Sequence, residues 1–338
     1  MMLVRPATMA DLTALEQLAV EAGIGMTTLP AQREALAEKI QNSVDSFARD
    51  VARPQDEAYL LLLEDLDSGR VAGSCGIIAR VGRTRPFYTF KVLNVTHTSQ
   101  ELDHYEPVEV LQMVDEYRGA TEIATLYVTP DYRKNRNGRL LSRCRFLLMA
   151  ETPQRFSHRV IAEMRGVQDE RGRSVFWDSL GRHFFDMDFS KADYLSSLGK
   201  YQFIADLMPK YPVYVRLLPK EAQSVIGVTH EATRPALELL KREGFRFEGC
   251  VDIFDAGPTI ACPLEEIRTV KESEAAEVGG IVDALDSEPY MIATARPHDF
   301  RATRASLRTK DDASILIQTD VAQSLKLEIG DKLTYARF

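Results

Sequence analysis

The chain has 338 residues, of which 45% are hydrophobic and 27% are charged, and its formal net charge is −8. This length predicts about two domains of roughly 100–200 residues. The acidic surplus argues against the broad basic face of nucleic-acid-binding proteins. No apolar segment approaches the about 18 residues of a membrane span, and the N-terminus lacks the apolar core of a secretion signal. We therefore expect a cytoplasmic protein with neither nucleic acid nor membrane as a partner.

The cysteines are scattered along the chain and include no CxxC pair, and no histidine pair has the spacing of metal ligands. They are Cys75, Cys144, Cys250 and Cys262. This pattern predicts reduced, mostly buried thiols, with no disulfide framework and no metal site.

The first 130 residues alternate between helical and extended patterns. A short strand precedes Thr8, which has Asp11 three residues later as in a capping box, and apolar residues then recur at helical spacing to Ala22. A second helix is predicted within residues 31–50. Residues 57–66 and 70–82 are rich in β-formers and predict a hairpin around "DSG". Residues 83–119 predict one strand plus an excursion, and "TEIATLYV" at 121–128 predicts a central strand.

The remaining residues continue this alternation. Apolar residues from Leu140 to Leu148 predict a helix with one buried stripe. Next come a strand at 159–164 and a helix within 173–185, which is expected to end at Gly181. A strand at 224–228 then leads into a helix capped by Thr233. This order of elements repeats that of residues 159–185, and the repeat leaves duplication and coincidence equally open. From residue 265 a helical pattern, a strand "SILIQ", a short helix and a strand "KLTYARF" predict a small α+β module.

One turn carries an unusual concentration of positive charge, in "LYVTPDYRKNRNGRLLSRCRFLLM" at 126–149. A strand that leads through a glycine-containing turn into a helix exposes free backbone N–H groups and the positive end of the helix dipole. An anion is expected there, held by basic side chains and approached closely at Gly138. The alternative is a solvated basic turn. The motifs GxxxxGK[ST] and GxGxxG are absent, which argues against a nucleoside-triphosphate or dinucleotide site. The basic residues are Arg133, Lys134, Arg136, Arg139 and Arg143.

The segment "VTPDYRKNRNGRLL" resembles the acyl-CoA pyrophosphate loop of the GNAT superfamily of N-acyltransferases. Arg133 has the first place of the loop pattern and Gly138 the last, but Arg136 replaces the usual first glycine. A narrower resemblance, to the alpha-chain type of the arginine N-succinyltransferase family, covers nearly the whole chain. Its segments are "RPATMADLTALEQLA", "GMTTLP", "GRHFFDMDFSKADYLS", "FIADLMPKYPVYVRLLP" and "DIFDAGPT".

The resemblance implies an α+β fold, GNAT-like, with a mixed and mostly antiparallel sheet, and it leaves a duplicated, tandem arrangement open. It implies a GNAT-like acyl-CoA-binding domain at 1–200 and a second GNAT-like half at 201–264. The small α+β module then occupies 265–338. An oligomer is expected, in which a related sister chain is an open alternative.

The resemblance also implies a reaction, in which the succinyl group of succinyl-CoA passes to the α-amino group of L-arginine or of ornithine. Succinyl-CoA is a co-substrate, and no permanently bound cofactor is expected. His230 in "GVTHEATRPA" is implied as the proton donor. The backbone of Leu126, Tyr127 and Val128 is implied to contact the pantetheine arm. The pyrophosphate is assigned to Arg133, Lys134, Arg136, Asn137, Gly138 and Arg139.

The sequence leaves several assignments open. The guanidinium of arginine needs a carboxylate, for which the candidates are Glu163, Asp178, Glu231 and Asp255. The distal succinyl carboxylate needs a cation or N–H groups, from Arg165, Arg182 or the "GMTTLP" turn. His183 is expected to be a packed structural histidine, and the other four histidines surface residues. Two further functions stay open, a non-catalytic acyl-CoA-binding partner of a paralogue and acetyl transfer to another amine.

Overall fold

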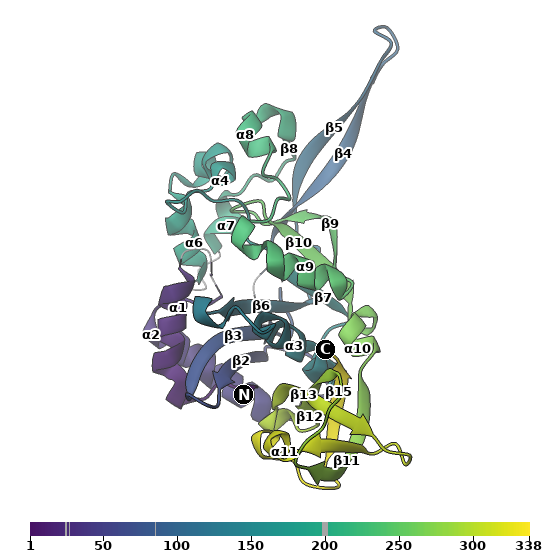
Figure 1. Ribbon diagram of the computed structural model, residues 1–338. Coiled ribbons are helices and arrows are strands. Elements are labelled where there is room, and N and C mark those ends of the chain that lie inside the picture. The colour runs from purple at the N-terminus through teal and green to yellow at the C-terminus, as the bar shows by residue number, and fades with distance from the viewer. Residues whose placement is uncertain (24–25, 27, 85, 198–201) are drawn as a thin grey trace.

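The strands of the protein form one long mixed sheet, which runs the length of the molecule (Figure 1). The computed structural model describes residues 1–338 except 24–25, 27, 85 and 198–201. In that part of the chain the strand order is β12-β15-β11-β14-β13-β1-β2-β3-β6-β7-β10-β9-β4-β5-β8. Neighbouring strands are antiparallel except for the parallel pairs β6–β7 and β11–β14. The expected mixed, mostly antiparallel sheet is thus confirmed. No helix in the described part is long and apolar enough to cross a membrane.

The N-terminal part of the chain supplies β1 (Met2–Pro6), β2 (Ala58–Asp65) and β3 (Arg70–Ile78), which pair in that order and lie between β13 and β6 in the sheet. Two helices, α1 (Leu12–Ala22) and α2 (Arg33–Ala48), cover this region, as predicted. The predicted capping box before α1 is present, because the Thr8 backbone N–H donates to Asp11 at 2.8 Å. The same carboxylate accepts two hydrogen bonds from Arg5, so β1 and the start of α1 are joined.

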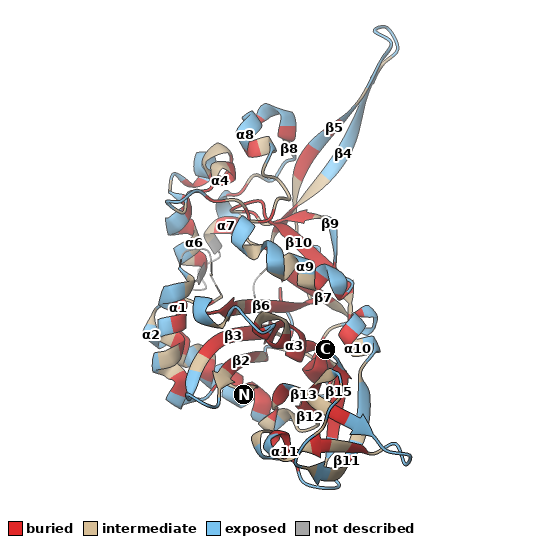
Figure 2. Cartoon of the chain, viewed as in Figure 1, coloured by how far each residue is buried: buried red, intermediate tan, exposed pale blue. Residues whose placement is uncertain are grey.

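The centre of the sheet is formed by β6 (Thr121–Val128) and β7 (Arg159–Glu163). Helix α3 (Asn137–Glu151) connects them and is buried on almost all sides (Figure 2). The prediction of a single buried stripe on α3 is therefore wrong. Other segments cover the face that would have been solvated: Arg143 is only 2% exposed and binds Glu243 and Thr269 at 2.9 Å each.

Residues 83–119 contain a long hairpin where one strand and an excursion were expected. Strands β4 (Thr89–Ser99) and β5 (His104–Val114) pair in full register from Thr89↔Val114 to Ser99↔His104. Only the base of the hairpin joins the sheet, and its outer part projects as a two-stranded arm (Figure 1). The arm shows little hydrophobic periodicity because its outer half has no core to face.

The second half of the chain returns to the same sheet. Strands β8 (Val213–Tyr214), β9 (Arg246–Val251) and β10 (Pro258–Pro263) pair with β5, β4 and β7, respectively. The helices of this region are short, apart from α6 and α9. They are α4 (Val175–Ser179), α5 (Arg182–Phe185), α6 (Phe189–Ser197), α7 (Gln202–Leu207), α8 (Lys220–Gln223) and α9 (Arg234–Arg242).

The helix expected within 173–185, with its end at Gly181, is present as α4, which ends at Ser179, and a further short helix, α5, starts at Arg182. Another prediction in this region is wrong. Residues 224–228 form turns, where a strand was expected, because Gly227 adopts a left-handed φ of 73° that interrupts an extended run. The loss of that strand removes one of the elements in the repeat of residues 159–185.

The C-terminal residues form a closed ring of strands. Strands β11 (Glu274–Val282), β12 (Pro289–Thr294), β13 (Ala302–Thr309), β14 (Ile315–Gln318) and β15 (Lys332–Arg337) close through the β12–β13 pair. The strands at "SILIQ" and "KLTYARF" and the short helix α11 (Thr319–Leu325) are confirmed. The prediction of a helix directly after residue 265 is mostly wrong, because before β11 only the short α10 (Arg268–Lys271) is α-helical. The ring joins the rest of the sheet through β13 and β1.

The segment "DIFDAGPT" approaches the end of β7 so closely that one of its positions excludes a side chain. A Cβ atom at Gly257 would lie 2.0 Å from the Met164 carbonyl oxygen and 2.6 Å from the Gly166 nitrogen. Both obstacles are backbone atoms, which cannot rotate away.

We predict that Gly257→Ala lowers the free energy of unfolding by about 3 kcal/mol, because the methyl group forces β10 and the end of β7 apart. Urea denaturation checks this. Gly138→Ala is the matched control, since a Cβ there meets nothing within 4 Å. Equal denaturation midpoints for the two variants would contradict the close approach.

Candidate active site

The central strands β6 and β7 separate shortly after they meet. Their parallel register consists of Thr121↔Val160 and Glu122↔Ile161 only. Beyond Glu122, Thr125 adopts a left-handed φ of 59°, and the pairing of β6 with β3 shifts register at the same place. This local distortion turns β6 away from β7.

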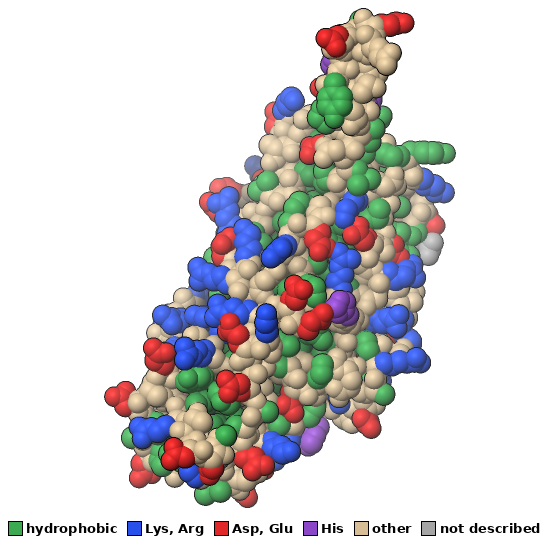
Figure 3. Space-filling model, turned by 90° about the vertical axis from the view of Figure 1, so that its right-hand side faces the viewer, with side chains coloured by type: hydrophobic (Ala, Val, Ile, Leu, Met, Phe, Trp, Pro, Cys, Tyr) green, Lys and Arg blue, Asp and Glu red, His purple; other side chains and the backbone are tan. Residues whose placement is uncertain are grey.

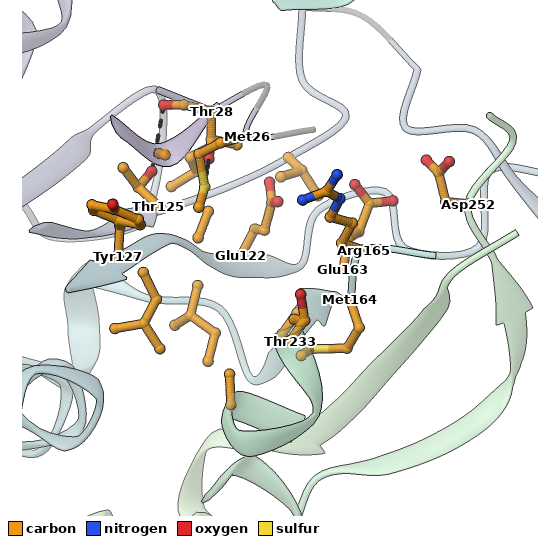
Figure 4. A pocket seen from close by; sticks show the side chains of 18 of the residues that line it. Met26, Thr28, Glu122, Thr125, Tyr127, Glu163, Met164, Arg165, Thr233 and Asp252 are labelled. Atoms are coloured by element: carbon orange, nitrogen blue, oxygen red, sulfur yellow. Dashed lines mark hydrogen bonds between the residues drawn. The ribbon is translucent and has the colours of Figure 1, made fainter. Parts of the chain in front are cut away.

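A cavity of about 1450 Å³ opens where the strands part. Residues of β6 and β7 line it, together with residues of α1, α2, α6 and α9 and of the loop before α3. Leu126, Tyr127 and Val128, which the resemblance assigned to the pantetheine arm, are among the lining residues. Figure 4 shows the side chains of Glu122, Glu163 and Arg165 projecting into the same space. A volume of this size exceeds the usual range of small-molecule pockets, so it can hold two substrates together.

The basic loop forms one end of the cavity. Arg133, Lys134, Arg136, Asn137 and Gly138 all line it. Asn135 and Arg136 have left-handed φ angles of 53° and 62°, and Arg136 is the N-cap residue of α3. This backbone conformation explains why glycine is usual at the place of Arg136, because a residue with a Cβ is strained there by about 1–2 kcal/mol.

Two basic residues of the predicted anion site lie elsewhere. Arg139 is not among the described residues that line the cavity, and its guanidinium lies 5.0 Å from the centre of the Phe338 ring. Arg143 is buried behind the loop. Burial lowers the pKa of both guanidinium groups from their usual value. The sequence suggested that both would surround an anion, because spacing along a helix does not reveal what covers each face.

A contact from the C-terminal ring supports the loop. The Arg304 side chain in β13 donates a hydrogen bond to the Asn135 carbonyl oxygen at 3.1 Å. Arg304 and Arg139 both lie over the Phe338 ring, at 4.9 and 5.0 Å. The last residue of the chain therefore packs against the helix that follows the loop.

His230 lies beside the cavity, although it is not among the described residues that line it. Its backbone N–H donates to the Arg165 carbonyl oxygen at 2.8 Å, and Ala232 and Thr233 line the cavity. The ring Nδ1 accepts a hydrogen bond from the Ala232 backbone N–H at 3.1 Å. Burial and the Arg165 charge lower the pKa of His230 from its usual value. A neutral ring whose Nδ1 accepts must carry its hydrogen on Nε2.

The cavity end near β7 is strongly acidic. Glu122, Glu163, Asp252 and Asp255 all line it. The Glu163 side chain is exposed to the cavity. Desolvation by the protein around it, with the charges of Asp252, Glu122 and Asp255, raises the pKa of its carboxyl well above the usual range. Burial also raises the pKa values of Asp252 and Asp255.

The structure shows which of the candidate carboxylates and cations for substrate binding line the cavity. Asp178 and Arg182 face one another outside the cavity lining, at 3.6 Å, and Glu231 is 86% exposed. Arg165 lines the cavity. In the "GMTTLP" turn, Met26, Thr28 and Pro30 line the cavity, whereas residues 25 and 27 lie outside the described part.

Sequence reasoning missed Glu122 and Asp252. A signal existed for Glu122, which is a charged residue inside an otherwise apolar central strand and is only 6% exposed. His183 is exposed, so its prediction as a packed histidine is wrong. The other four histidines are exposed, and all four cysteines are buried and free, as predicted.

Comparison with known proteins assigns the chain to a family. A family model described as "Arginine N-succinyltransferase beta subunit" matches residues 2–269, and the model of its C-terminal domain matches 275–337. The chain belongs to the arginine N-succinyltransferase family. The sequence-based recognition of this family is confirmed.

Relatives in the arginine N-succinyltransferase family match from end to end. The chain is 39% identical to the arginine N-succinyltransferase of Citrobacter koseri and 40% identical to that of Escherichia coli 55989, over 100% of this chain and 98% of each relative. A solved structure of arginine/ornithine succinyltransferase subunit AI from Pseudomonas aeruginosa superimposes with a TM-score of 0.91 at 33% identity, covering 100% of this chain and 98% of that one. The family model names a beta subunit and the solved structure is of a subunit AI, so the expected alpha-chain type stays a prediction.

The left-handed conformation at Arg136 gives a stability prediction. We expect Arg136→Gly to leave the free energy of unfolding within about 1 kcal/mol of the parent, because relief of strain and the greater freedom of the unfolded chain offset each other. Arg136→Val should lose about 1–2 kcal/mol, since a β-branched residue is poorly accommodated at positive φ. Urea denaturation of both variants measures this difference. Equal stabilities for glycine and valine would show that residue 136 is not left-handed in solution.

Proposed function

We propose that this chain is a succinyl-CoA:arginine N-succinyltransferase with a GNAT-type arrangement of its acyl-CoA site. The observation that carries the proposal is the cavity between β6 and β7, which has the basic loop at one end and a group of carboxylates at the other. A cavity with opposite charges at its two ends suits a polyanionic acyl-CoA and a cationic amino acid. Family membership and full-length similarity to arginine N-succinyltransferases support the same reaction.

The acyl-CoA is proposed to lie along β6 and the loop. Beyond Glu122 the β6 edge no longer pairs with β7, so the backbone of Leu126, Tyr127 and Val128 is available to an extended pantetheine arm, as to an added strand. The pyrophosphate is proposed to bind at the N-terminus of α3 beside Gly138. Arg133 also links the loop to the end of β6, because its Nε donates a hydrogen bond to the Val128 carbonyl oxygen at 2.9 Å.

In the proposed reaction the neutral α-amino nitrogen of arginine attacks the thioester carbonyl carbon. A C–N bond forms, the C–S bond breaks, and the proton that the nitrogen loses ends on the CoA sulfur. The Nε2–H of His230 is proposed to donate a hydrogen bond to the charge that develops on the oxygen or the departing sulfur. The lowered pKa of His230 and the hydrogen bond at Nδ1 support a neutral ring with Nε2 as its donor.

The distal carboxylate of the succinyl group is proposed to bind Arg165. This side chain lines the cavity, and its Nε and one terminal nitrogen donate to Gln168, with the closer contact at 2.6 Å. That contact orients the guanidinium group. Arg182 lies 3.6 and 3.3 Å from the carboxylates of Asp178 and Asp188 and does not line the cavity, which argues against it.

The division into 1–200, 201–264 and 265–338, the tandem arrangement, the cytoplasmic location and the oligomer with its sister chain remain proposals. The ring closed by β12 and β13 supports a separate C-terminal module. The two open alternatives, a non-catalytic acyl-CoA-binding partner and an acetyltransferase, are decided by the assay below.

The purified chain alone should release CoA from succinyl-CoA when L-arginine is added, and ornithine should be compared with it. Release of CoA with acetyl-CoA but not with succinyl-CoA would favour the acetyltransferase. Binding of CoA without any turnover would favour the non-catalytic partner.

Gly138→Val tests the proposed CoA site. The added side chain enters open space in the cavity wall, so the variant should fold. We expect the KM for succinyl-CoA to rise about tenfold or more, because the branched chain obstructs the close approach of the pyrophosphate to the helix N-terminus. The KM for arginine serves as the internal control and should change less. Unchanged affinity for CoA by calorimetry would contradict this placement.

His230→Ala tests the proposed donor. We expect kcat to fall by about 10²- to 10⁴-fold with CoA affinity nearly intact, because His230 handles charge at the reacting carbonyl and does not hold the nucleotide. Since the pKa of His230 is lowered, its ring is neutral at and above its ordinary titration range, and activity should fall only as the pH drops below that range. Single-turnover rates at several pH values check both points. A variant with the parental rate and profile would remove this role.

A further inference from the structure

The acidic end of the cavity contains a carboxylate for which the described protein supplies no partner. Glu163 has no hydrogen bond and no ion pair with any described residue, and its side chain lines the cavity, where it is exposed to solvent. An ionised carboxylate that faces other carboxylates is repelled by them, so a cation that enters the cavity would bind there favourably.

The other carboxylates nearby are already engaged. Asp255 accepts hydrogen bonds from the backbone N–H groups of Gly166 and Gly257, at 2.8 and 2.9 Å. Asp252 accepts from the backbone N–H groups of Phe254 and Asp255, at 2.7 and 2.8 Å. These two aspartates therefore stabilise the loop before β10. Their charges face Glu163 and increase its need for a cation.

The basic side chains of Arg165 and Lys39 lie in this part of the cavity but face groups other than Glu163. Arg165 donates to Gln168 and is close enough to Asp255 and Asp193 for their charges to affect its pKa. Lys39 of α2 lies near Glu122, whose charge opposes the effect of burial on the lysine pKa. Glu163 and Glu122 project from neighbouring strands into the same part of the cavity (Figure 4).

A second observation indicates that a ligand completes this cavity. The Ser196 residue of α6 is 3% exposed and lines the same cavity, and its hydroxyl has no hydrogen-bond partner among the residues that the structure describes. Asp193, one helical turn earlier, also lines the cavity and faces Arg165. A buried hydroxyl without a partner is uncommon in a native structure, and a polar ligand group would supply the partner.

We propose that Glu163, with Glu122 beside it, binds the cationic side-chain end of the amino-acid substrate and selects a guanidinium or ammonium group. This inference rests on the proposed function and deepens it, since it names the group that recognises the acceptor. A planar guanidinium can donate two parallel hydrogen bonds to one carboxylate, which makes the recognition geometric as well as electrostatic. The raised pKa of Glu163 agrees with a site whose cation is absent.

The position of Glu163 suits this role. It is the last residue of β7 and is followed by Met164 and Arg165, which also line the cavity. The proposed succinyl contact at Arg165 and the proposed cation contact at Glu163 are therefore two residues apart, on a strand end that parts from β6. The acceptor side chain and the succinyl carboxylate would be held by neighbouring groups of opposite charge.

Glu163→Gln tests the proposal, because the amide keeps the shape and removes the charge. We expect the KM for arginine to rise about 30-fold or more, while the KM for succinyl-CoA stays within about twofold. The variant should be at least as stable as the parent, since a negative charge that faces Asp252 and Asp255 is removed. Asp178→Asn is the matched control, a carboxylate that the sequence also suggested and that lies outside the cavity lining.

Citrulline supplies a readout that a merely structural role of Glu163 would not change. Its ureido group is nearly isosteric with guanidinium but carries no charge. The parent should bind arginine far more tightly than citrulline in calorimetry, and Glu163→Gln should reduce this preference by about tenfold or more. An unchanged KM for arginine and an unchanged preference over citrulline would overturn the proposal.

Failure of the proposed function gives a different result. If the parent chain shows no acceptor-dependent release of CoA, the transferase proposal fails, and calorimetry with arginine alone then decides the cation site. Arginine binding that weakens in Glu163→Gln and not in Asp178→Asn would support the site. Equal binding by all three proteins, or no binding to the parent, would overturn it.

Discussion

The separation of β6 from β7 is the constraint on which the rest of the structure depends. The two strands share only two register pairs before Thr125 adopts a left-handed conformation and β6 turns away. A parallel sheet that continued would have paired these backbone groups and filled the space between the strands with side chains. Because it does not continue, the centre of the sheet contains a cavity lined by backbone groups that an extended ligand can bind.

Segments far apart in the sequence surround this cavity. Residues 246–263 return after almost a hundred residues to pair with β7, and their loop brings Asp252 and Asp255 to its end. The close approach of Gly257 to Met164 and Gly166 holds that loop in place. On the opposite side, Arg304 and Phe338 of the C-terminal ring contact the basic loop and the start of α3. The ring therefore supports the loop rather than the acidic end.

Charge is separated inside the cavity but intermixed on the face of the molecule that Figure 3 shows. Over the face in Figure 3 the acidic and basic side chains are intermixed, with no broad basic patch. Inside the cavity the basic loop and the carboxylates of β6, β7 and the loop before β10 lie at different ends. Interactions between charges are stronger where water is excluded, so this internal separation matters more for substrate orientation than the net charge of the chain.

The sequence by itself determined the elements whose signals are local. The capping box at Thr8, the helices α1 and α2, the β2–β3 hairpin and the glycine-containing basic turn depend on residues within a few positions of one another, and all appear in the structure. The tertiary structure alone decided which carboxylates and arginines face the cavity. Glu163, Asp178, Glu231 and Asp255 are equivalent in a sequence, because burial and partners come from segments up to a hundred residues away. The same holds for Arg139 and Arg143, whose direction depends on contacts with Phe338 and Glu243.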